Sequence, residues 1–170
     1  MQGLRARQFL RGVAMATERT LIILKPDAVQ RGLLGAVLSR FESRGFSIAG
    51  MKMAKLSAAT LKEHYAHIAD KPFFPGIASF MSSSPVVVAV IEGKDAVQVT
   101  RDMCGPTNAR KALPGTIRGD YSLSMQCNVI HASDSPESAH KEIARFFKQD
   151  ELHSYSRMLH DVTYSADEKQ

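Results

Sequence analysis

Apolar and polar residues follow two different periods along this chain, and together they predict an alternation of strands and helices. Residues 21–24 form a continuous apolar run, typical of a strand that is buried on both faces. The stretch Lys25-Pro26-Asp27 ends this strand, because proline cannot donate to a sheet ladder. Apolar residues then recur every three or four positions from Leu34 to Phe41, which predicts an amphipathic helix closed by Gly45.

The segments that follow continue this alternation. Valine and isoleucine fill most of residues 85–91, which makes this segment the clearest strand in the chain. We also expect a strand over residues 46–56 that Gly50 interrupts, a helix over 57–68 with Ser57 as its N-cap, a short helix over 77–81 and a helix over 94–104. Residues 105–120 contain several glycines and prolines and predict a long irregular segment, a kind of loop that is often functional.

The last strand and the last helix are predicted on either side of His131. A period of two places apolar residues at Tyr121, Leu123, Met125, Cys127 and Val129, which predicts a half-buried strand. Residues 133–135 are good N-cap residues and Pro136 suits a first helical position, so a helix is expected over 136–148. The order β-α-β-(α)-β-α-β-α predicts an α/β (α+β) fold of the ferredoxin-like βαββαβ type, with a four-stranded antiparallel sheet and helices packed on one face.

His131 therefore lies between a strand end and a helix start, where unpaired N–H groups and the helix dipole favour anions. The period of two places Asn128 and His131 on opposite faces of the strand. If both residues line one site, the strand must end or bulge between them. We predict that irregularity.

Composition limits the class of protein. The chain has 170 residues, 44% of them hydrophobic and 23% charged, which is typical of one globular domain with its own core. No apolar run reaches the length of a membrane span, and two cysteines are too few for a disulfide framework, which favours a reducing compartment. The net charge of +5 falls to +2 without Arg5, Arg7 and Arg11, which weakens a nucleic-acid hypothesis.

The N-terminal stretch differs from the rest of the chain. Residues 1–17 contain three arginines and no acidic residue, as an organelle transit peptide does. Two other interpretations stay open: Met15 is the true start, or the extension is a disordered tail. We expect a cytoplasmic protein, or a mitochondrial or other organellar one if the extension is a transit peptide.

Six histidines and a few basic residues are candidates for chemistry. His64 and His67 are expected on a solvated helix face, since no closed set of zinc ligands surrounds them. His140, His153 and His160 lie in polar sequence and are expected to be exposed. Lys25, Arg101 and Arg118 would form a phosphate clamp if the fold brought them to His131. Because neither a P-loop nor a Rossmann glycine motif is present, such a clamp must consist of side chains.

The sequence resembles the nucleoside diphosphate kinases, from Glu18 to about Tyr155. The resemblance depends on Lys25-Pro26-Asp27, on Arg118-Gly119-Asp120 and, above all, on Asn-Val-Ile-His-Ala-Ser-Asp-Ser at residues 128–135. Shorter blocks match in the expected order: His64-Tyr65, Pro72-Phe73-Phe74 and Ser84-Pro85-Val86-Val87. It divides the chain into a basic extension at 1–17, a nucleoside diphosphate kinase domain at 18–155 and a polar tail at 156–170.

The resemblance implies an exchange of the γ-phosphate between nucleoside triphosphates, such as ATP, and nucleoside diphosphates. His131 would be the nucleophile, phosphorylated on Nδ1, and Glu142 would orient its ring directly or through Ser133. The residues implied to bind the nucleotide are Lys25, Tyr65, Phe73, Ile77, Arg101, Thr107, Arg118 and Asn128. Mg²⁺ would be the cofactor, held by the nucleotide's phosphates with no protein side chain as an assigned ligand.

The resemblance also implies a homo-oligomer and favours a hexamer over a tetramer, a choice that the sequence itself leaves open. From the sequence we expect no membrane partner and no nucleic-acid partner. The alternatives are a ferredoxin-like RNA-binding module and a catalytically silent member of the family. The RNA-binding module would need aromatic RNP strands, which are absent. The silent member is disfavoured because the candidate catalytic residues occur together.

Overall fold

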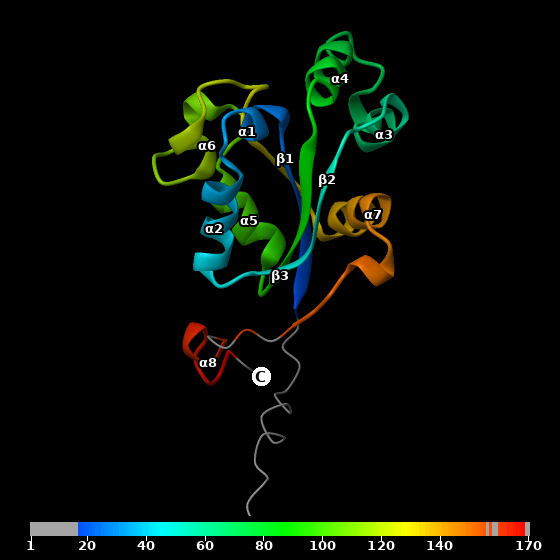
Figure 1. The fold of residues 1–170 in the computed structure, drawn as a ribbon. Helices are drawn as coiled ribbons and strands as arrows, with labels where there is room; N and C mark the ends of the chain where they lie inside the picture. Colours follow the sequence, from blue (N-terminus) through cyan, green and yellow to red (C-terminus); the bar gives the residue numbers. More distant parts are fainter. Residues whose placement is uncertain (1–16, 156, 158–159, 169–170) are drawn as a thin grey trace, which may run out of the picture.

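The computed structural model describes residues 17–155, 157 and 160–168, so the predicted extension at 1–17 lies almost entirely outside the described residues. Four strands form one antiparallel sheet in the order β2-β3-β1-β4 (Figure 1). Their bounds are β1 Glu18–Leu24, β2 Ser47–Ala54, β3 Val86–Gly93 and β4 Ile130–Ala132. The predicted four-stranded antiparallel sheet is confirmed.

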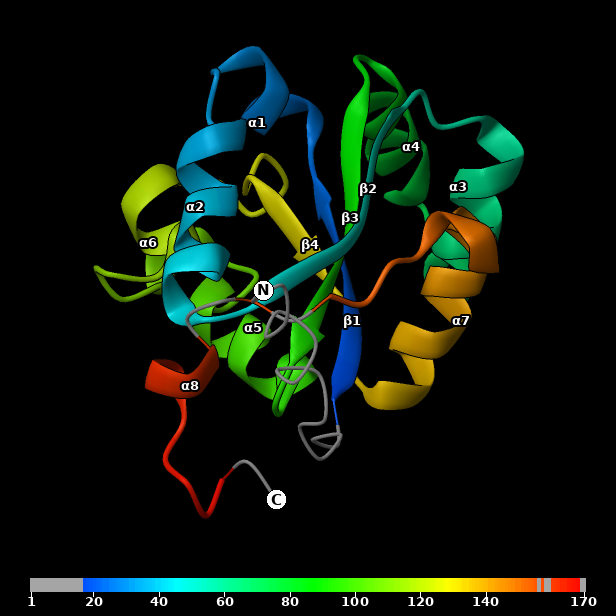
Figure 2. The ribbon, with the colours of Figure 1, turned by 60° about the horizontal axis from the view of Figure 1, so that its bottom comes forward.

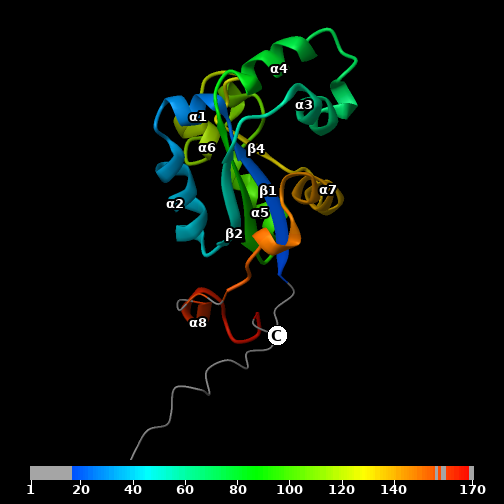
Figure 3. The same cartoon turned by 45° about the vertical axis from the view of Figure 1, so that its right-hand side comes forward.

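Helices cover both faces of this sheet, and the prediction of helices on one face was wrong. On one side lie α1 Pro26–Gln30, α2 Leu34–Arg44, α5 Ala96–Cys104 and α6 Ile117–Tyr121; on the other lie α3 Ala58–His64, α4 Phe74–Ser82 and α7 Pro136–Phe146 (Figures 2 and 3). Short 3-10 helices occur at Ala66–Ile68, Ala109–Lys111 and Gln149–Glu151, and α8 spans His160–Thr163. The two central strands require this arrangement, because β3 is buried at every position and β1 at its last five.

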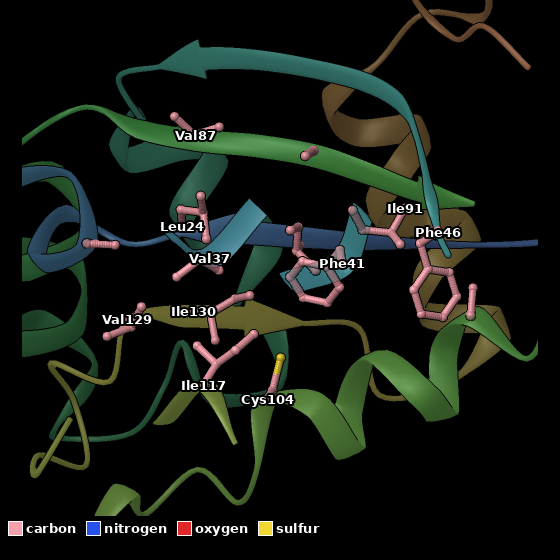
Figure 4. Packing of buried hydrophobic residues seen from close by; sticks show 14 residues of the cluster. Leu24, Val37, Phe41, Phe46, Val87, Ile91, Cys104, Ile117, Val129 and Ile130 are labelled. Atoms are coloured by element: carbon pink, nitrogen blue, oxygen red, sulfur yellow. The ribbon is translucent and has the colours of Figure 1, made fainter. Parts of the chain in front are cut away.

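Each face of the sheet carries its own apolar cluster. The first joins Ile22 and Leu24 of β1 to Phe41 of α2 and to residues of α5 and α6 (Figure 4). The second joins Leu21 and Ile23 of the same strand to α3, α4 and α7. Successive residues of β1 therefore pack into opposite cores. This packing holds the strand in place, and with it the position of Lys25, which directly follows the strand.

Several local predictions are confirmed by backbone geometry. Gly45 closes α2 with a φ of 108°, and Ser57 caps α3 by accepting a hydrogen bond from the Thr60 backbone. The predicted interruption of β2 is a shift in register between Ile48 and Gly50. A side chain at Gly50 would press on Leu152, so this position also lets the C-terminal segment approach the strand.

Other elements were missed or misplaced. The helix α4 begins at Phe74, before the predicted start at Ile77, and the short helices α1 and α6 were not predicted. The tail predicted from residue 156 is anchored where it is described, since Arg157 donates to the backbone oxygens of Glu42 and Phe46. None of the described helices combines the length and apolarity needed to cross a bilayer.

The half-buried strand predicted over residues 121–129 was wrong. Tyr121 ends α6, and the residues that follow form a loop in which Leu123 is 82% exposed and Met125 is 59% exposed. The alternating polar residues hold the loop together: the Ser122 hydroxyl donates to the Cys127 carbonyl, and the Ser124 hydroxyl accepts from the Cys127 backbone. The period of two thus reflects serine–backbone hydrogen bonds within a loop.

Candidate active site

A cavity of about 540 Å³ collects most of the predicted site residues. Its lining residues come from the end of β1, the α3–α4 region, the loop after α5, and β4. Eight predicted residues line it: Lys25, Tyr65, Phe73, Ile77, Arg101, Thr107, Arg118 and His131. The remaining three, Asn128, Ser133 and Glu142, are not among its lining residues. Asn128 bonds to Lys25 and Glu142 to His131, both of which line the cavity, and Ser133 bonds to Glu142.

The imidazole of His131 is held from one edge. In the short strand β4, His131 pairs with Ile23 of β1. Its Nε2 lies 3.0 Å from Oε2 of Glu142, and the Ser133 hydroxyl donates to the same oxygen at 2.7 Å. Because an ionised carboxylate only accepts, Nε2 carries the ring proton, and Nδ1 keeps its lone pair.

The carboxyl group of Glu142 is suited to this role. Burial alone would raise its pKa, but the hydrogen bond and charge of His131, together with the hydrogen bond from Ser133, hold the pKa of Glu142 below its ordinary value. The group is therefore ionised at neutral pH and accepts from both neighbours.

The irregularity predicted between Asn128 and His131 is present at Val129. This buried, β-branched residue has a φ of 71°, and β4 begins only at the next residue. Two groups of the Lys25-Pro26-Asp27 stretch hold the turn: the Lys25 backbone donates to the Val129 carbonyl, and the Asp27 carboxylate accepts from the Val129 N–H. The sequence block therefore fixes the backbone just before His131.

Asn128 is completely buried and its amide is occupied by the protein itself. Its Nδ2 donates to the backbone oxygens of Thr107 and Met125, and its Oδ1 accepts from Nζ of Lys25 at 2.5 Å. Asn128 therefore joins three segments that line the cavity and sets the position of the Lys25 ammonium.

Lys25 and Arg118 bring positive charge close together. Burial is the main cause that lowers the pKa of Lys25 to about 8, and the Arg118 charge adds to it. The Arg118 guanidinium donates to the backbone oxygens of Gly105 and Ile130, each at 2.6 Å, so it also connects the loop after α5 to β4. Burial lowers the pKa of Arg118 as well, but an arginine remains charged in a protein.

The rest of the cavity wall is largely apolar. The aromatic residue Phe73 is 55% exposed and lies four positions before Ile77 of α4. The sequence prediction missed several lining residues: Ile68, Phe80, Met81, Met125 and Gln126. Met125 was missed because it was assigned to a strand.

The expectation that His64 lies on a solvated helix face was wrong. His64 is buried, its ring packs edge-on against that of His131 with 4.7 Å between centroids, and its Nδ1 lies 3.9 Å from Oε1 of Glu142. The signal that could have placed it is its spacing from Leu61, three residues earlier on the buried face of α3. His67, His140 and His153 are exposed as predicted, and the side chain of His160 lies outside the described residues.

Among the described residues, His64, His131 and Glu142 form the one group of potential metal ligands, with ligand atoms within 4.8 Å of one another. They are already engaged in a hydrogen-bonded arrangement, and the cationic Arg145 lies 3.4 Å from Nδ1 of His64. No carboxylate lies among the described residues that line the cavity. The site thus offers a nucleophilic nitrogen, three cationic side chains and an apolar wall, a combination suited to a phosphorylated ligand with a planar ring.

Comparisons with known proteins agree with this geometry. The family profile for nucleoside diphosphate kinase matches residues 18–152. The nucleoside diphosphate kinases of Parabacteroides distasonis and Carboxydothermus hydrogenoformans are 54% and 52% identical to the chain, over 89% and 86% of its length and 99% of theirs. The structure of a halophilic nucleoside diphosphate kinase from Halobacterium salinarum in complex with CDP superposes with a TM-score of 0.84 at 43% identity, covering 87% of this chain and 99% of that one. The chain belongs to the nucleoside diphosphate kinase family.

Proposed function

We propose that His131 carries the phosphoryl group in the nucleoside diphosphate kinase reaction of this chain. The observation that supports this role is the hydrogen bond between Nε2 of His131 and Glu142, since it leaves Nδ1 as the nucleophilic nitrogen in a cavity lined by Lys25, Arg101 and Arg118.

The reaction then runs as two displacements at one site. The Nδ1 lone pair attacks the γ-phosphorus of a nucleoside triphosphate, the bond from that phosphorus to the bridging oxygen breaks, and the diphosphate leaves with the electron pair. A terminal oxygen of a second nucleoside diphosphate attacks the phosphorus in turn, and the P–N electrons return to Nδ1. Because one site serves donor and acceptor alternately, the kinetics are ping-pong.

Glu142 and Ser133 are assigned to positioning the ring of His131. The ring becomes positively charged as the P–N bond forms, and the Glu142 carboxylate at 3.0 Å from Nε2 stabilises that charge. Ser133 donates to the same carboxylate oxygen and accepts from the Leu21 backbone at 3.3 Å, so it ties Glu142 to the central strand.

Lys25, Arg101, Arg118 and Thr107 are assigned to the phosphates. Phosphoryl transfer through a loose transition state depends mainly on positioning and on positive charge at the equatorial oxygens. We assign the oxygen-facing positions to Lys25 and Arg101. Arg118 contributes its positive charge from the cavity wall, because two of its nitrogens already donate to the backbone carbonyls of Gly105 and Ile130.

The nucleotide base is assigned to Phe73, on which it would stack, and to Ile77 beside it. Tyr65 is assigned to supporting the site near Lys25. Stacking on an aromatic ring accepts any base, which fits an enzyme that acts on several nucleotides. Asn128, expected to bind the ribose, is assigned here to holding Lys25, because its amide is already fully bonded.

Mg²⁺ is the proposed cofactor, bound through the nucleotide. The described residues that line the cavity include lysine and arginines but no carboxylate, which suits a metal whose oxygen ligands are phosphates and water. When bound, the ion neutralises charge on the phosphates and orients them.

Homo-oligomerisation, as a hexamer, is part of the proposal. The strand β2 forms one edge of the sheet, and Met51 and Met53 on it are 54% and 58% exposed. An exposed apolar edge strand is a surface that self-association would cover. Sedimentation equilibrium of the intact chain tests the hexamer, and a monomeric mass would overturn it.

We assign the chain to the cytoplasm, because both cysteines are free in the structure and a reducing compartment keeps them so. A transit function of residues 1–17 would place it in an organelle instead. The mass of the N-terminus isolated from cells tests the assignment: loss of the basic extension during import would contradict it.

Incubation with γ-labelled ATP tests the central role. The intact chain should take up label that is stable in base and lost in acid, as a phosphohistidine is, and unlabelled diphosphate should remove it. His131→Ala should take up no such label. Label of the same stability in His131→Ala would refute the role of His131, and no label on the wild type would favour a silent family member.

A further inference from the structure

His64 is buried beside His131, yet it is suited neither to bind the substrate as a charged group nor to act as a base. Its side chain is 1% exposed, and its ring contacts those of His131, Tyr65 and Phe146. Burial, with the charges of His131 and Arg145, lowers the pKa of His64 to about 3, so it is neutral near pH 7. It can therefore neither supply a charge nor exchange a proton during the reaction.

The hydrogen bonds of His64 define its tautomer. An arginine can only donate, so Nη1 of Arg145, 3.4 Å away, donates to Nδ1 of His64, and the ring proton lies on Nε2. That Nε2 is buried and has no hydrogen-bond partner among the described residues. A buried, unpaired N–H costs free energy that a phenylalanine or leucine at this place would not, so packing alone does not account for a histidine.

Arg145 and Glu142 are three residues apart on α7, a spacing at which arginine and glutamate side chains ordinarily pair. Both side chains are described and largely buried, yet they form no ion pair. Nδ1 of His64 lies near both, 3.4 Å from Nη1 of Arg145 and 3.9 Å from Oε1 of Glu142. Arg145 instead donates its Nε hydrogen to Glu63 at 2.8 Å.

We propose that His64 is a positioning residue that keeps the Arg145 cation away from the Glu142 carboxylate, so that this carboxylate serves His131. A direct Arg145–Glu142 pair would neutralise much of the negative charge that stabilises the ring of His131 during transfer. The neutral imidazole prevents this in two ways: it fills the space between the two groups, and its Nδ1 accepts the Arg145 hydrogen. The inference depends on the proposed role of His131.

The test compares the rate of single-turnover phosphorylation by γ-labelled ATP between the folded wild type and its His64 variants. Rapid-quench experiments measure this rate. His64→Phe keeps a ring of similar size but removes the acceptor. It should slow labelling by about tenfold, comparable to the smaller losses of activity when a residue that orients a metal ligand is replaced. His64→Gln keeps an acceptor and should label within about threefold of wild type. If His64→Phe does not fold, His64→Leu takes its place in every comparison.

Second-site variants separate charge from packing. Arg145→Met in the His64→Phe background should restore labelling to within about threefold of wild type, because the competing cation is gone. Lys141→Met is the matched control: it removes another α7 cation, one that pairs with Glu137, and should restore nothing. In proton–nitrogen-15 correlation spectra, the resonance of the His131 Nε2–H proton should move upfield in His64→Phe. In the double variant with Arg145→Met it should return to its wild-type position.

Three results would overturn the inference: wild-type labelling rates in His64→Phe, equal slowing in the single variant and its Arg145→Met double variant, or equal rescue by Lys141→Met. Each of these requires normal labelling of the wild type. A wild type without acid-labile label, or one whose label survives His131→Ala, would refute the proposed role of His131 instead.

Discussion

Lys25→Met is expected to change how the stability of the protein depends on pH. Burial lowers the pKa of the Lys25 ammonium from 10.5 to about 8, so the folded chain gives up this proton more readily than the unfolded chain does. The folded state therefore bears a penalty for the charged form that is fully present below about pH 8. The penalty is relieved as the pH rises from about 8 towards 10.5.

The size of the effect follows from the shift. Each pH unit between the two pKa values changes the free energy of unfolding by about 1.4 kcal/mol, because only the unfolded chain still binds the proton there. Between about pH 8 and about pH 9.5 this amounts to roughly 2 kcal/mol in favour of the folded wild type. Lys25→Met lacks the titrating group and lacks this gain.

Guanidinium denaturation at about pH 7 and about pH 9.5, at one protein concentration, measures the difference. Tyr65 and Cys104, whose pKa values burial raises to about 12 and about 11, are common to both proteins, so their contributions cancel when the two are compared. The wild type should gain roughly 2 kcal/mol relative to the variant at the higher pH. Lys55→Met, at an exposed lysine, serves as the control and should follow the wild type.

An unfolding free energy that differs between wild type and Lys25→Met by the same amount at both pH values would contradict this expectation. So would a loss of wild-type stability relative to the variant as the pH rises. Either result would mean that the Lys25 ammonium is not penalised by burial and that its hydrogen bond to Asn128 dominates.

Glu142→Gln should slow phosphorylation of His131 by about 10- to 100-fold, because glutamine keeps an acceptor but loses the charge. Rapid-quench labelling measures this rate, and an unchanged rate would contradict the role of the carboxylate. Gly119→Ala should destabilise the fold by about 1–3 kcal/mol in urea denaturation, because the added methyl would press on the Leu113 carbonyl; wild-type stability would show that this loop yields without strain. Phe41→Ala should cost about 3–5 kcal/mol in the same assay, since the ring is fully buried in the core between the sheet and α2, and a loss below about 1 kcal/mol would be inconsistent with that packing.

The elements that sequence patterns predicted well are those whose period reports burial. The helix from Leu34 and the strand from Val86 have apolar residues at the positions that face the core, so period and burial coincide. The segment from Tyr121 to Val129 has the same kind of period for another reason, namely serines that bond to their own loop. Period alone does not distinguish the two cases.

The site was harder to predict than the fold, because its residues meet only through the sheet order. Lys25 directly follows β1, Arg101 lies on α5 and Arg118 on α6, and no local spacing shows that they line one cavity. The family resemblance named these residues, and the structure supplies what holds them. His64 was misjudged because its polar type suggested solvent, whereas its helix face is the buried one.

The strand β1 carries the site in a way that limits how the enzyme can lose activity. His131 pairs with Ile23 of this strand, Ser133 bonds to its Leu21, and Lys25 follows its last residue, Leu24. The last five residues of the strand are buried between two cores. Amides in such a strand exchange with solvent mainly through global opening of the protein. Inactivation by heat or denaturant should therefore coincide with unfolding of the whole domain, with no stage at which a folded chain has lost its catalytic geometry.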